Sequence, residues 1–167
     1  MYDIGDLIIY SAHGICKIED ICDKTISGKT KKYYVMHPLE NNHKLTISTP
    51  VDNEKVIMKK LVPKEDAKLL IDSFKGEGKK WIDNPNMRSQ KYNELVATGN
   101  RLEIAKIINT LMRMQMKVES EGKKFYEQDR KLLGSLQSIL FKELAISLNT
   151  TFENIHQTVL RQIEKRN

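Results

Sequence analysis

The sequence predicts an α+β protein in which a small, bent antiparallel sheet is followed by a bundle of about five helices. Two observations predict this fold class. Up to residue 62, short runs of β-branched and aromatic residues alternate with turn-forming residues. From Pro63 onward, apolar residues recur at a spacing of about 3.6 positions, which is the period of an α-helix. We therefore expect a sheet domain over residues 1–62 and a helical domain over residues 63–167.

The strands of the first domain are expected to be short and joined by hairpins. The pairs His13-Gly14, Ser27-Gly28 and Asn41-Asn42 are typical of tight turns. A sheet of this size has little interior, so its edge strands and loop tips are the surfaces that a partner can use. The expected strands are residues 7–10, 15–22, 32–36, 44–48 and 56–58.

The helices of the second domain have recognisable starts and stops. Three signals indicate where a helix starts: a proline at the first helical position, an Asp, Asn or Thr at the cap position, and a Glu three residues after the cap. Gly76 and Gly99 are expected to end the first two helices. The start signals are Pro63, Asp83 or Asn84 with Pro85, Asn100 with Glu103, and Thr150 with Glu153, while the fourth helix is expected over about residues 126–148.

One apolar face of each predicted helix is expected to form the core. The length of the third helix suggests a central position in the bundle. We interpret Met112, Met114 and Met116 as residues that fill gaps in this core. The side chains expected to face inward are Ala67, Leu70, Ile71, Phe74, Tyr92, Leu95, Val96, Ile104, Ile107, Ile108, Leu111, Met114, Leu132, Leu133, Leu136, Ile139, Leu140, Leu144, Phe152, Ile155, Val159 and Ile163.

Composition and charge narrow the class of protein. The chain has 167 residues, 40% hydrophobic and 30% charged, which is enough for one ordinary domain or two small ones. No run approaches the roughly 18 apolar residues that span a bilayer, so we expect a cytoplasmic protein without membrane contact, whose two cysteines stay thiols. The net charge is +6, and the helical part carries +5 of it, nineteen Lys and Arg against fourteen Asp and Glu. Such an excess agrees with a nucleic-acid partner but also with charged helix faces.

The only tryptophan, Trp81, lies in a basic segment between two predicted helices. Cations surrounding one flat apolar ring suit an element that contacts phosphates and presses the ring against bases. A lone tryptophan is also a common core residue, so the pattern leaves both interpretations open. The segment is KGEGKKWIDNPNMRSQKY, residues 75–92, with its cations at Lys75, Lys79, Lys80, Arg88 and Lys91.

The residues that an enzyme or a metal site would need are not arranged in a known pattern. The sequence has no phosphate-binding glycine loop and no G-x-S-x-G motif, and the acids of the helices alternate with lysines as on a solvated face. We therefore expect no catalytic residue, no metal and no cofactor. The His and Cys residues whose spacing matches no zinc motif are His13, His37, His43, Cys16 and Cys22.

Several stretches in the same order resemble one family. GDLIIYSAHGICKIEDI is similar to the "GD-x-V-x-Y-P-x-H-G" opening of the CarD (CdnL) family of bacterial transcription regulators. That opening module is shared with the RNA-polymerase-interacting domain of transcription-repair coupling factors. LTISTP resembles the family's strand before a proline, WIDNPNMRSQKYNELVATGN its tryptophan loop and following helix, and RKLLGSLQSILFKELA its penultimate long helix. The resemblance covers essentially the whole chain.

The resemblance implies a Tudor-like sheet domain that binds the RNA polymerase β subunit and a helical domain that contacts promoter DNA at the upstream edge of the melted bubble. The protein would then stabilise the open promoter complex, without recognising a base sequence, as a monomer. Trp81 would be a wedge inserted from the minor groove. By position, the implied DNA contacts are Lys79, Lys80, Arg88, Lys91, Arg130 and Lys131, and the implied polymerase contacts are Lys24, Thr46, Ile47, Ser48 and Thr49.

Three features depart from the family pattern. Ser11 stands where a proline is common, Ser48 stands where some members have an arginine that touches polymerase, and the spacer from Trp81 to Tyr92 is longer than in some relatives. A serine cannot form the planar, two-bond pairing of an arginine, so backbone pairing at the edge strand is expected to matter more. The alternative function is an interaction adaptor whose helical bundle binds a protein, with Trp81 as the interface anchor.

Overall fold

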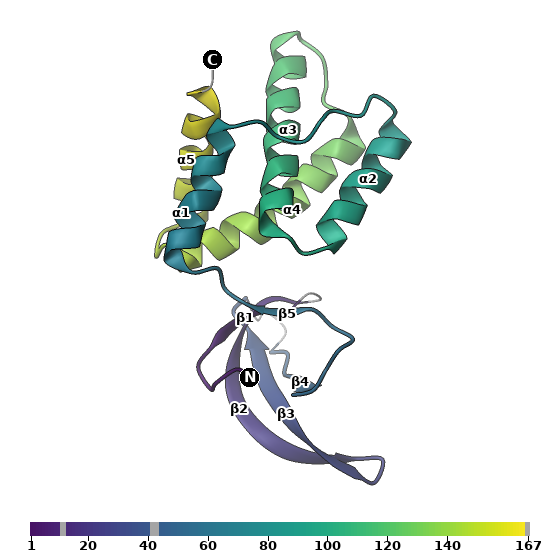
Figure 1. Cartoon of the computed structure of the whole chain (residues 1–167), viewed down its shortest axis with the longest axis vertical. Coiled ribbons are helices and arrows are strands. Elements are labelled where there is room, and N and C mark those ends of the chain that lie inside the picture. The colour runs from purple at the N-terminus through teal and green to yellow at the C-terminus, as the bar shows by residue number, and fades with distance from the viewer. Residues whose placement is uncertain (11–12, 41–43, 166–167) are drawn as a thin grey trace. The chain divides into compact units, whose positions relative to one another are not determined.

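The computed structural model describes residues 1–10, 13–40 and 44–165 (Figure 1). The chain separates into two compact units, Met1–Leu61 and a second unit that begins at Val62. A five-stranded antiparallel sheet forms the first unit and five α-helices form the second, so the α+β prediction is confirmed. The predicted turn at Asn41-Asn42, and the positions of Ser11 and His43, lie outside the described residues.

The sheet has the strand order β4-β3-β2-β1-β5, with every neighbouring pair antiparallel. Two strands are longer than predicted, and the last two begin three and two residues later, because the β-branched pattern does not locate strand ends accurately. Lys44, expected in the fourth strand, instead has a positive φ of 50°. The bounds are β1 (Leu7–Tyr10), β2 (Gly14–Ile26), β3 (Lys29–Pro38), β4 (Ile47–Pro50) and β5 (Met58–Lys60).

The longest hairpin joins β2 to β3 through the predicted Ser27-Gly28 turn. Both turn residues have positive φ, 54° and 76°, as a two-residue type I′ turn requires. A register shift between Ile18 and Asp20 marks a bulge in β2, which bends the strand. Figure 1 shows the resulting pair as a long curved ribbon. The sheet encloses only a small core, in which Ile8, Cys16, Ile18, Tyr34 and Met36 are almost fully buried.

The two cysteines are free thiols, as expected from the sequence. Cys16 is buried in the core of the sheet, and this burial raises the pKa of its thiol. A buried thiol with a raised pKa is a poor nucleophile, so Cys16 behaves as a small apolar core residue.

The helices begin close to the predicted positions. Asn84 accepts hydrogen bonds from the amides of Asn86 and Met87, both at 3.0 Å, and Asn100 accepts one from the amide of Glu103. The last helix is capped by Thr151, one residue later than predicted, and Pro63 is the cap residue of the first helix instead of its first helical residue. The bounds are α1 (Lys64–Asp72), η1 (Ser73–Lys75), α2 (Pro85–Ala97), α3 (Arg101–Ser120), α4 (Glu127–Ser147) and α5 (Phe152–Glu164).

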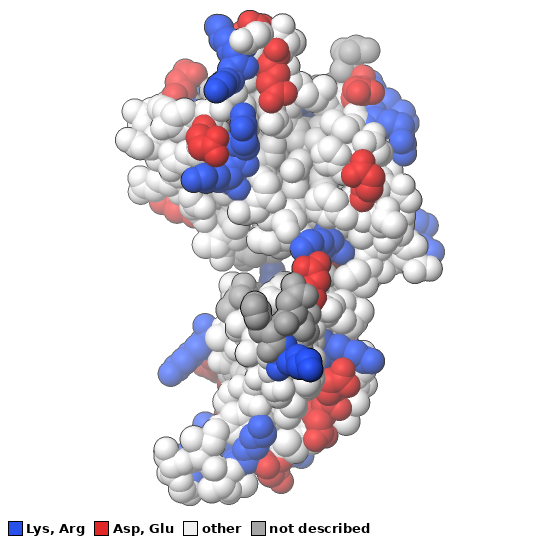
Figure 2. Space-filling model, turned by 180° about the vertical axis from the view of Figure 1, so that it is seen from behind, with Lys and Arg blue, Asp and Glu red and all other residues white. Residues whose placement is uncertain are grey.

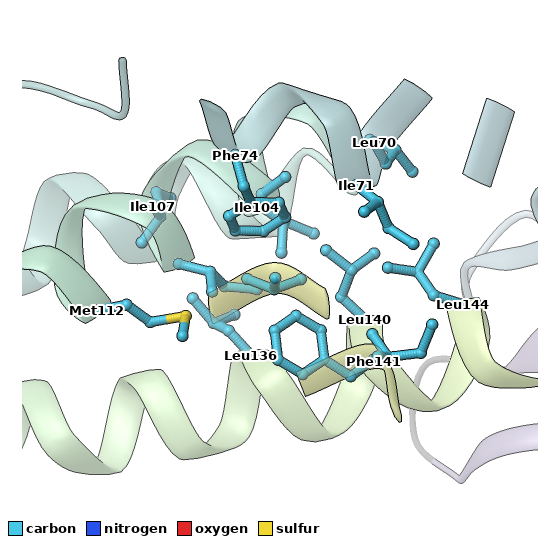
Figure 3. Close-up of a cluster of buried hydrophobic side chains, with 14 of the residues drawn as sticks. Leu70, Ile71, Phe74, Ile104, Ile107, Met112, Leu136, Leu140, Phe141 and Leu144 are labelled. Atoms are coloured by element: carbon cyan, nitrogen blue, oxygen red, sulfur yellow. The ribbon is translucent and has the colours of Figure 1, made fainter. Parts of the chain in front are cut away.

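The helical core is built around α3, as its length predicted. Ile107, Ile108 and Leu111 of α3 are fully buried, and side chains of α1, η1 and α4 converge on the same cluster (Figure 3). Ile139, predicted to face inward, is 53% exposed, and Phe152 is 38% exposed although its ring centroid lies 5.8 Å from that of the buried Phe141. The 3.6-residue period identifies the apolar side of a helix, but neighbouring helices decide how much of that side they cover.

The three methionines of α3 lie at different depths. Met112 is buried in the core, Met114 is partly buried, and Met116 is 42% exposed. The interpretation as gap-filling core residues therefore holds for Met112 and is wrong for Met116.

Among the described residues, no helix has the length and hydropathy needed to cross a membrane. Over the same part of the chain, no three His, Cys, Asp or Glu side chains come together as a metal site.

Candidate nucleic-acid and polymerase interfaces

Trp81 lies in the extended segment that joins η1 to α2, which we call the tryptophan segment (residues 76–84). Its indole is half-buried and packs against the edge of the helical core together with Ile82. Trp81 is therefore neither fully buried in the core nor fully exposed.

Arg88 of α2 lies against the indole. Its guanidinium carbon is 4.1 Å from the centroid of the Trp81 ring, within the range of a cation–π interaction. The same guanidinium forms a two-bond ion pair with Asp129 of α4, from Nε to Oδ1 at 3.0 Å and from Nη2 to Oδ2 at 2.6 Å. Its remaining nitrogen, Nη1, donates to the carbonyl oxygens of Ile82 and Asp83, at 2.7 and 3.3 Å.

Arg88 does not fit the role of a phosphate contact that the resemblance implied. The residue is only 3% exposed, and each of its guanidinium nitrogens already donates within the domain. A phosphate could reach the guanidinium only if Asp129 were left as an unpaired buried charge. Arg88 is therefore an internal support of the tryptophan segment.

Helix α3 holds the first part of the tryptophan segment through its backbone. Asn109 donates to the carbonyl oxygen of Gly76 at 3.2 Å, and Thr110 donates to that of Lys79 at 2.7 Å. The amide of Lys79 donates to the carbonyl oxygen of Lys106 at 3.3 Å. An extended segment normally leaves such groups to water, so these bonds fix its path along α3.

Lys79 also forms an ion pair with Glu103 in the first turn of α3. The hydrogen bond from the ammonium group, and then its charge, hold the pKa of Glu103 below its usual range. Because Glu103 compensates its charge, Lys79 is a weaker candidate for a phosphate contact than the basic residues without such a neighbour.

Tyr92 of α2 supports the residue just before Trp81. Its hydroxyl donates to the carbonyl oxygen of Lys80 at 2.9 Å, and the side chain is 1% exposed. Burial raises the pKa of Tyr92 to about 12, while Arg88 lowers it and Asp129 raises it. A raised pKa means that the protonated hydroxyl is favoured in the fold. This contribution to stability is fully present below pH about 10 and is lost only as the pH rises toward 12.

Gly78 allows the tryptophan segment to lie this close to α3. A Cβ atom at this position would collide with Thr110 Oγ1 and would lie 2.8 Å from the Lys106 carbonyl oxygen and 2.9 Å from the Thr110 amide. Two of these three atoms are backbone atoms, which cannot move aside cheaply.

We expect Gly78→Ala to displace the tryptophan segment and to destabilise the helical domain by about 1 to 3 kcal/mol, the usual cost of overfilling a close contact. Chemical denaturation followed by circular dichroism measures the loss. Gly134→Ala is the matched control, because nothing lies within 4 Å of the added carbon at that helical position. Equal stability of the two variants would contradict the close approach described above.

The remaining predicted DNA contacts are exposed. Lys80, Lys91, Arg130 and Lys131 all reach solvent, with Arg130 only 3.8 Å from Glu127 in a surface ion pair. Gln128 donates to Ser89 at 2.9 Å, so the start of α4, which carries Arg130 and Lys131, lies beside α2, which carries Lys91. Figure 2 shows that basic and acidic side chains are interspersed on the face it presents, without a broad field of one sign.

Four of the five predicted polymerase contacts, residues 46–49, lie in or next to the edge strand β4. Strand β4 pairs with β3 only, so its other side has no strand partner in the described part of the chain. Thr46 and Ser48 are exposed, whereas Ile47 and Thr49 are 8% and 3% exposed and point into the sheet domain. Ile47 and Thr49 can therefore contact a partner through their backbone and not through their side chains.

Lys24 and Ser48 are brought together across the sheet. The Lys24 ammonium donates to Ser48 Oγ at 2.7 Å, although the two residues are on strands β2 and β4. The serine that stands where some relatives have an arginine thus holds the end of a lysine side chain. A positive charge is present at this edge, but it comes from strand β2, which β3 separates from β4 in the sheet.

Several supporting residues were not predicted from the sequence. Asp129 and Thr110 looked like ordinary helical residues, and their partners, Arg88 of α2 and Lys79 of the tryptophan segment, are 41 and 31 positions away. No local pattern signals such pairs. The only available hint was the two glycines before Trp81, which indicated an unusual backbone path.

Comparison with known proteins agrees with this description. Residues 2–70 match the model of the CarD-like/TRCF RID domain, and residues 69–160 match the model of the CarD C-terminal domain. A sheet domain and a helical domain of these two types define a transcription regulator that interacts with RNA polymerase. The chain belongs to the CarD family. It is 28% identical over 160 residues to a protein of Bacillus subtilis (strain 168) named "Putative transcription factor YdeB", covering 93% of this chain and 97% of that protein.

Proposed function

We propose that this CarD-family protein binds the RNA polymerase β subunit through the β4 edge of its sheet and promoter DNA through Trp81. Contact at the upstream edge of the melted bubble then stabilises the open complex without recognition of a base sequence. The observation that carries the proposal is the half-buried Trp81 on a segment that α2, α3 and α4 hold in place. Catalysis, a metal and a cofactor have no part in this function, and a monomer suffices for it.

A fixed indole suits the junction between paired and melted DNA. Stacking of one base on an aromatic ring is worth roughly 1 to 3 kcal/mol, and every base offers a face for it. Because the tryptophan segment is already bonded to its neighbours, little of that energy is lost in ordering the protein. The stacked contact exists only when the bubble is open, so it favours the open state.

The exposed cations would contact phosphates, which are the same in every sequence. The candidates are Lys80 beside Trp81 in the tryptophan segment, Lys91 on α2, and Arg130 and Lys131 near the start of α4, and all four are exposed. A few such contacts give weak binding alone. Attachment to polymerase raises the effective concentration of the helical domain at the promoter, so weak binding is enough.

We expect Lys91→Ala, Arg130→Ala and Lys131→Ala each to weaken DNA association about equally on unrelated promoters. Each variant should reduce the slope of log affinity against log salt by roughly one, because one fewer counterion is released. The measurement is a salt titration of binding to two promoters of different sequence.

Arg161→Ala is the matched control for these three variants. Arg161 is an exposed cation on α5, and Figure 1 shows α5 and α2 on opposite sides of α3 within the helical domain. An equal loss of salt dependence in this control would indicate a general charge effect and would contradict the proposed contacts.

We expect Lys24→Glu to weaken polymerase binding and to leave DNA binding by the helical domain unchanged. The substitution reverses the charge held by Ser48 at the β4 edge. Binding to the isolated β subunit measures the effect, with Lys60→Glu on β5, at the opposite edge of the sheet, as the control. Equal weakening by both variants would show that the β4 edge is not the specific site.

The proposal as a whole is tested by footprinting polymerase on promoter DNA with and without the protein. A change in protection at the upstream bubble edge supports it. The adaptor alternative predicts protein–protein binding by the helical domain with little salt dependence, because an interface anchored by an aromatic ring releases few counterions.

A further inference from the structure

Trp81 is held by a buried ion pair that belongs to two other elements. Arg88 comes from α2 and Asp129 from α4, with their side chains 4% and 5% exposed. The Arg88 guanidinium lies against the indole ring of Trp81 and pairs with the Asp129 carboxylate. It also donates to the carbonyl oxygens of Ile82 and Asp83, the two residues after Trp81.

A second arginine–carboxylate pair in the same domain offers a comparison, with the Arg101 side chain 24% exposed and the Glu143 side chain 2% exposed. Arg101 and Glu143 form two bonds, at 2.9 and 2.8 Å, and Glu143 accepts the amide of Val62 at 2.7 Å. This pair links the start of α3, and the residue before Pro63, to α4. The two pairs are therefore alike in chemistry and differ in what they hold.

We propose that Arg88 and Asp129 are positioning residues that hold the indole of Trp81 in one orientation at the domain surface. This inference rests on the proposed DNA contact of Trp81 for its functional consequence, but not for its structural part. Asp129 fixes the plane of the guanidinium, and the guanidinium supports one face of the ring. The part of the ring that Arg88 and the core leave uncovered is the part that meets a base.

The size of the effect follows from the conformers that the ion pair excludes. A tryptophan side chain has three staggered χ1 wells and about two χ2 orientations, so roughly three to six conformers compete when nothing holds the ring. If one of them suits the DNA junction, loss of the support reduces the competent population, and hence the stabilisation of the open complex, about three- to sixfold. This is smaller than the loss expected when the ring is removed.

The test uses the fluorescence of the full chain, because Trp81 is its only tryptophan. Time-resolved anisotropy reports how freely the ring moves on the nanosecond scale, and acrylamide quenching reports its accessibility. The main variant is Arg88→Met combined with Asp129→Leu, since replacing a buried ion pair by apolar residues of similar size is often neutral for stability. Arg101→Met with Glu143→Leu is the matched control.

We expect the Arg88/Asp129 double variant to show fast local motion of the indole, stronger quenching and a three- to sixfold loss of open-complex stabilisation. The control variant should show none of these changes. Arg88→Lys provides a second variant if the double variant does not fold, because it keeps the charge but loses the planar two-bond pairing and the stacked contact. Partial restraint of the ring in this variant supports the role of the guanidinium plane.

Unchanged anisotropy and quenching in a folded variant would overturn the inference, as would equal changes in the control. Free motion of the ring with unchanged promoter opening would refute its functional part. If Trp81→Ala itself leaves opening unchanged, the proposed DNA contact fails, whereas the fluorescence still decides whether the ion pair positions the ring.

Discussion

Trp81→Ala is expected to lower the stability of the open promoter complex about five- to a hundredfold while polymerase binding stays intact. The reason is that a stacked contact of roughly 1 to 3 kcal/mol is made only with the open state, so its loss shifts the opening equilibrium by its full value. Trp81→Phe should keep part of the effect, because a smaller ring still stacks. Dissociation of preformed open complexes after addition of a competitor measures the change.

The partial burial of Trp81 makes a stability control necessary. A fully buried tryptophan cut to alanine typically costs about 3 to 5 kcal/mol of folding free energy. Only part of this ring packs against the helical core, so we expect a smaller cost and a variant that is folded at the assay temperature. A large drop in melting temperature, with no opening defect beyond the loss of folded protein, would show that Trp81 is a core residue and not a wedge.

Asp129→Ala is expected to lower the unfolding free energy of the helical domain by about 3 to 5 kcal/mol. The substitution removes the Asp129 carboxylate and leaves the charged Arg88 guanidinium buried. Its remaining neighbours, the Ile82 and Asp83 carbonyl groups and the Trp81 indole, carry no negative charge that could neutralise it. For a domain of about this size, such a loss lowers the melting temperature by roughly 10 °C or more. Urea denaturation and thermal unfolding measure it.

Glu127→Ala is the control for this prediction. Glu127 lies in the same first turn of α4, but its side chain is 65% exposed and its partner Arg130 is 3.8 Å away. Surface pairs of this kind contribute little, so the control should change stability by no more than about 0.5 kcal/mol. Similar stability of the two variants would mean that the Arg88–Asp129 pair contributes no more than a surface contact.

The same residues contribute to the stability of the helical domain and to the position of the Trp81 indole. Tyr92, Arg88 and Thr110 each bond the backbone of the tryptophan segment, and each is also buried against helices that form the core. A substitution at any of them is expected to affect both properties. The double replacement of the ion pair is useful because it removes the support for the ring without leaving a charge buried.

The order and type of the elements could be predicted from the sequence alone, because local rules govern them. Asn84 and Asn100 cap the helices that follow them, and Ser27-Gly28 forms the turn that its residue types favour. Strand ends were predicted less accurately. Pairing with neighbouring strands decides where β4 and β5 begin, and that information does not reside in their own residues.

For the candidate site, too, some features could be predicted from the sequence and others depend on the tertiary structure. The sequence by itself determined that Trp81 lies in a basic segment between two helices, and it determined the family pattern that surrounds it. Only the tertiary structure decided which cations are available. In the sequence, Arg88 and Lys91 are equivalent basic residues of one segment, but Arg88 is buried against Asp129 and Trp81 whereas Lys91 is exposed. The physical reason is that an ion pair depends on distance in space, and its partner here is 41 positions away along the chain.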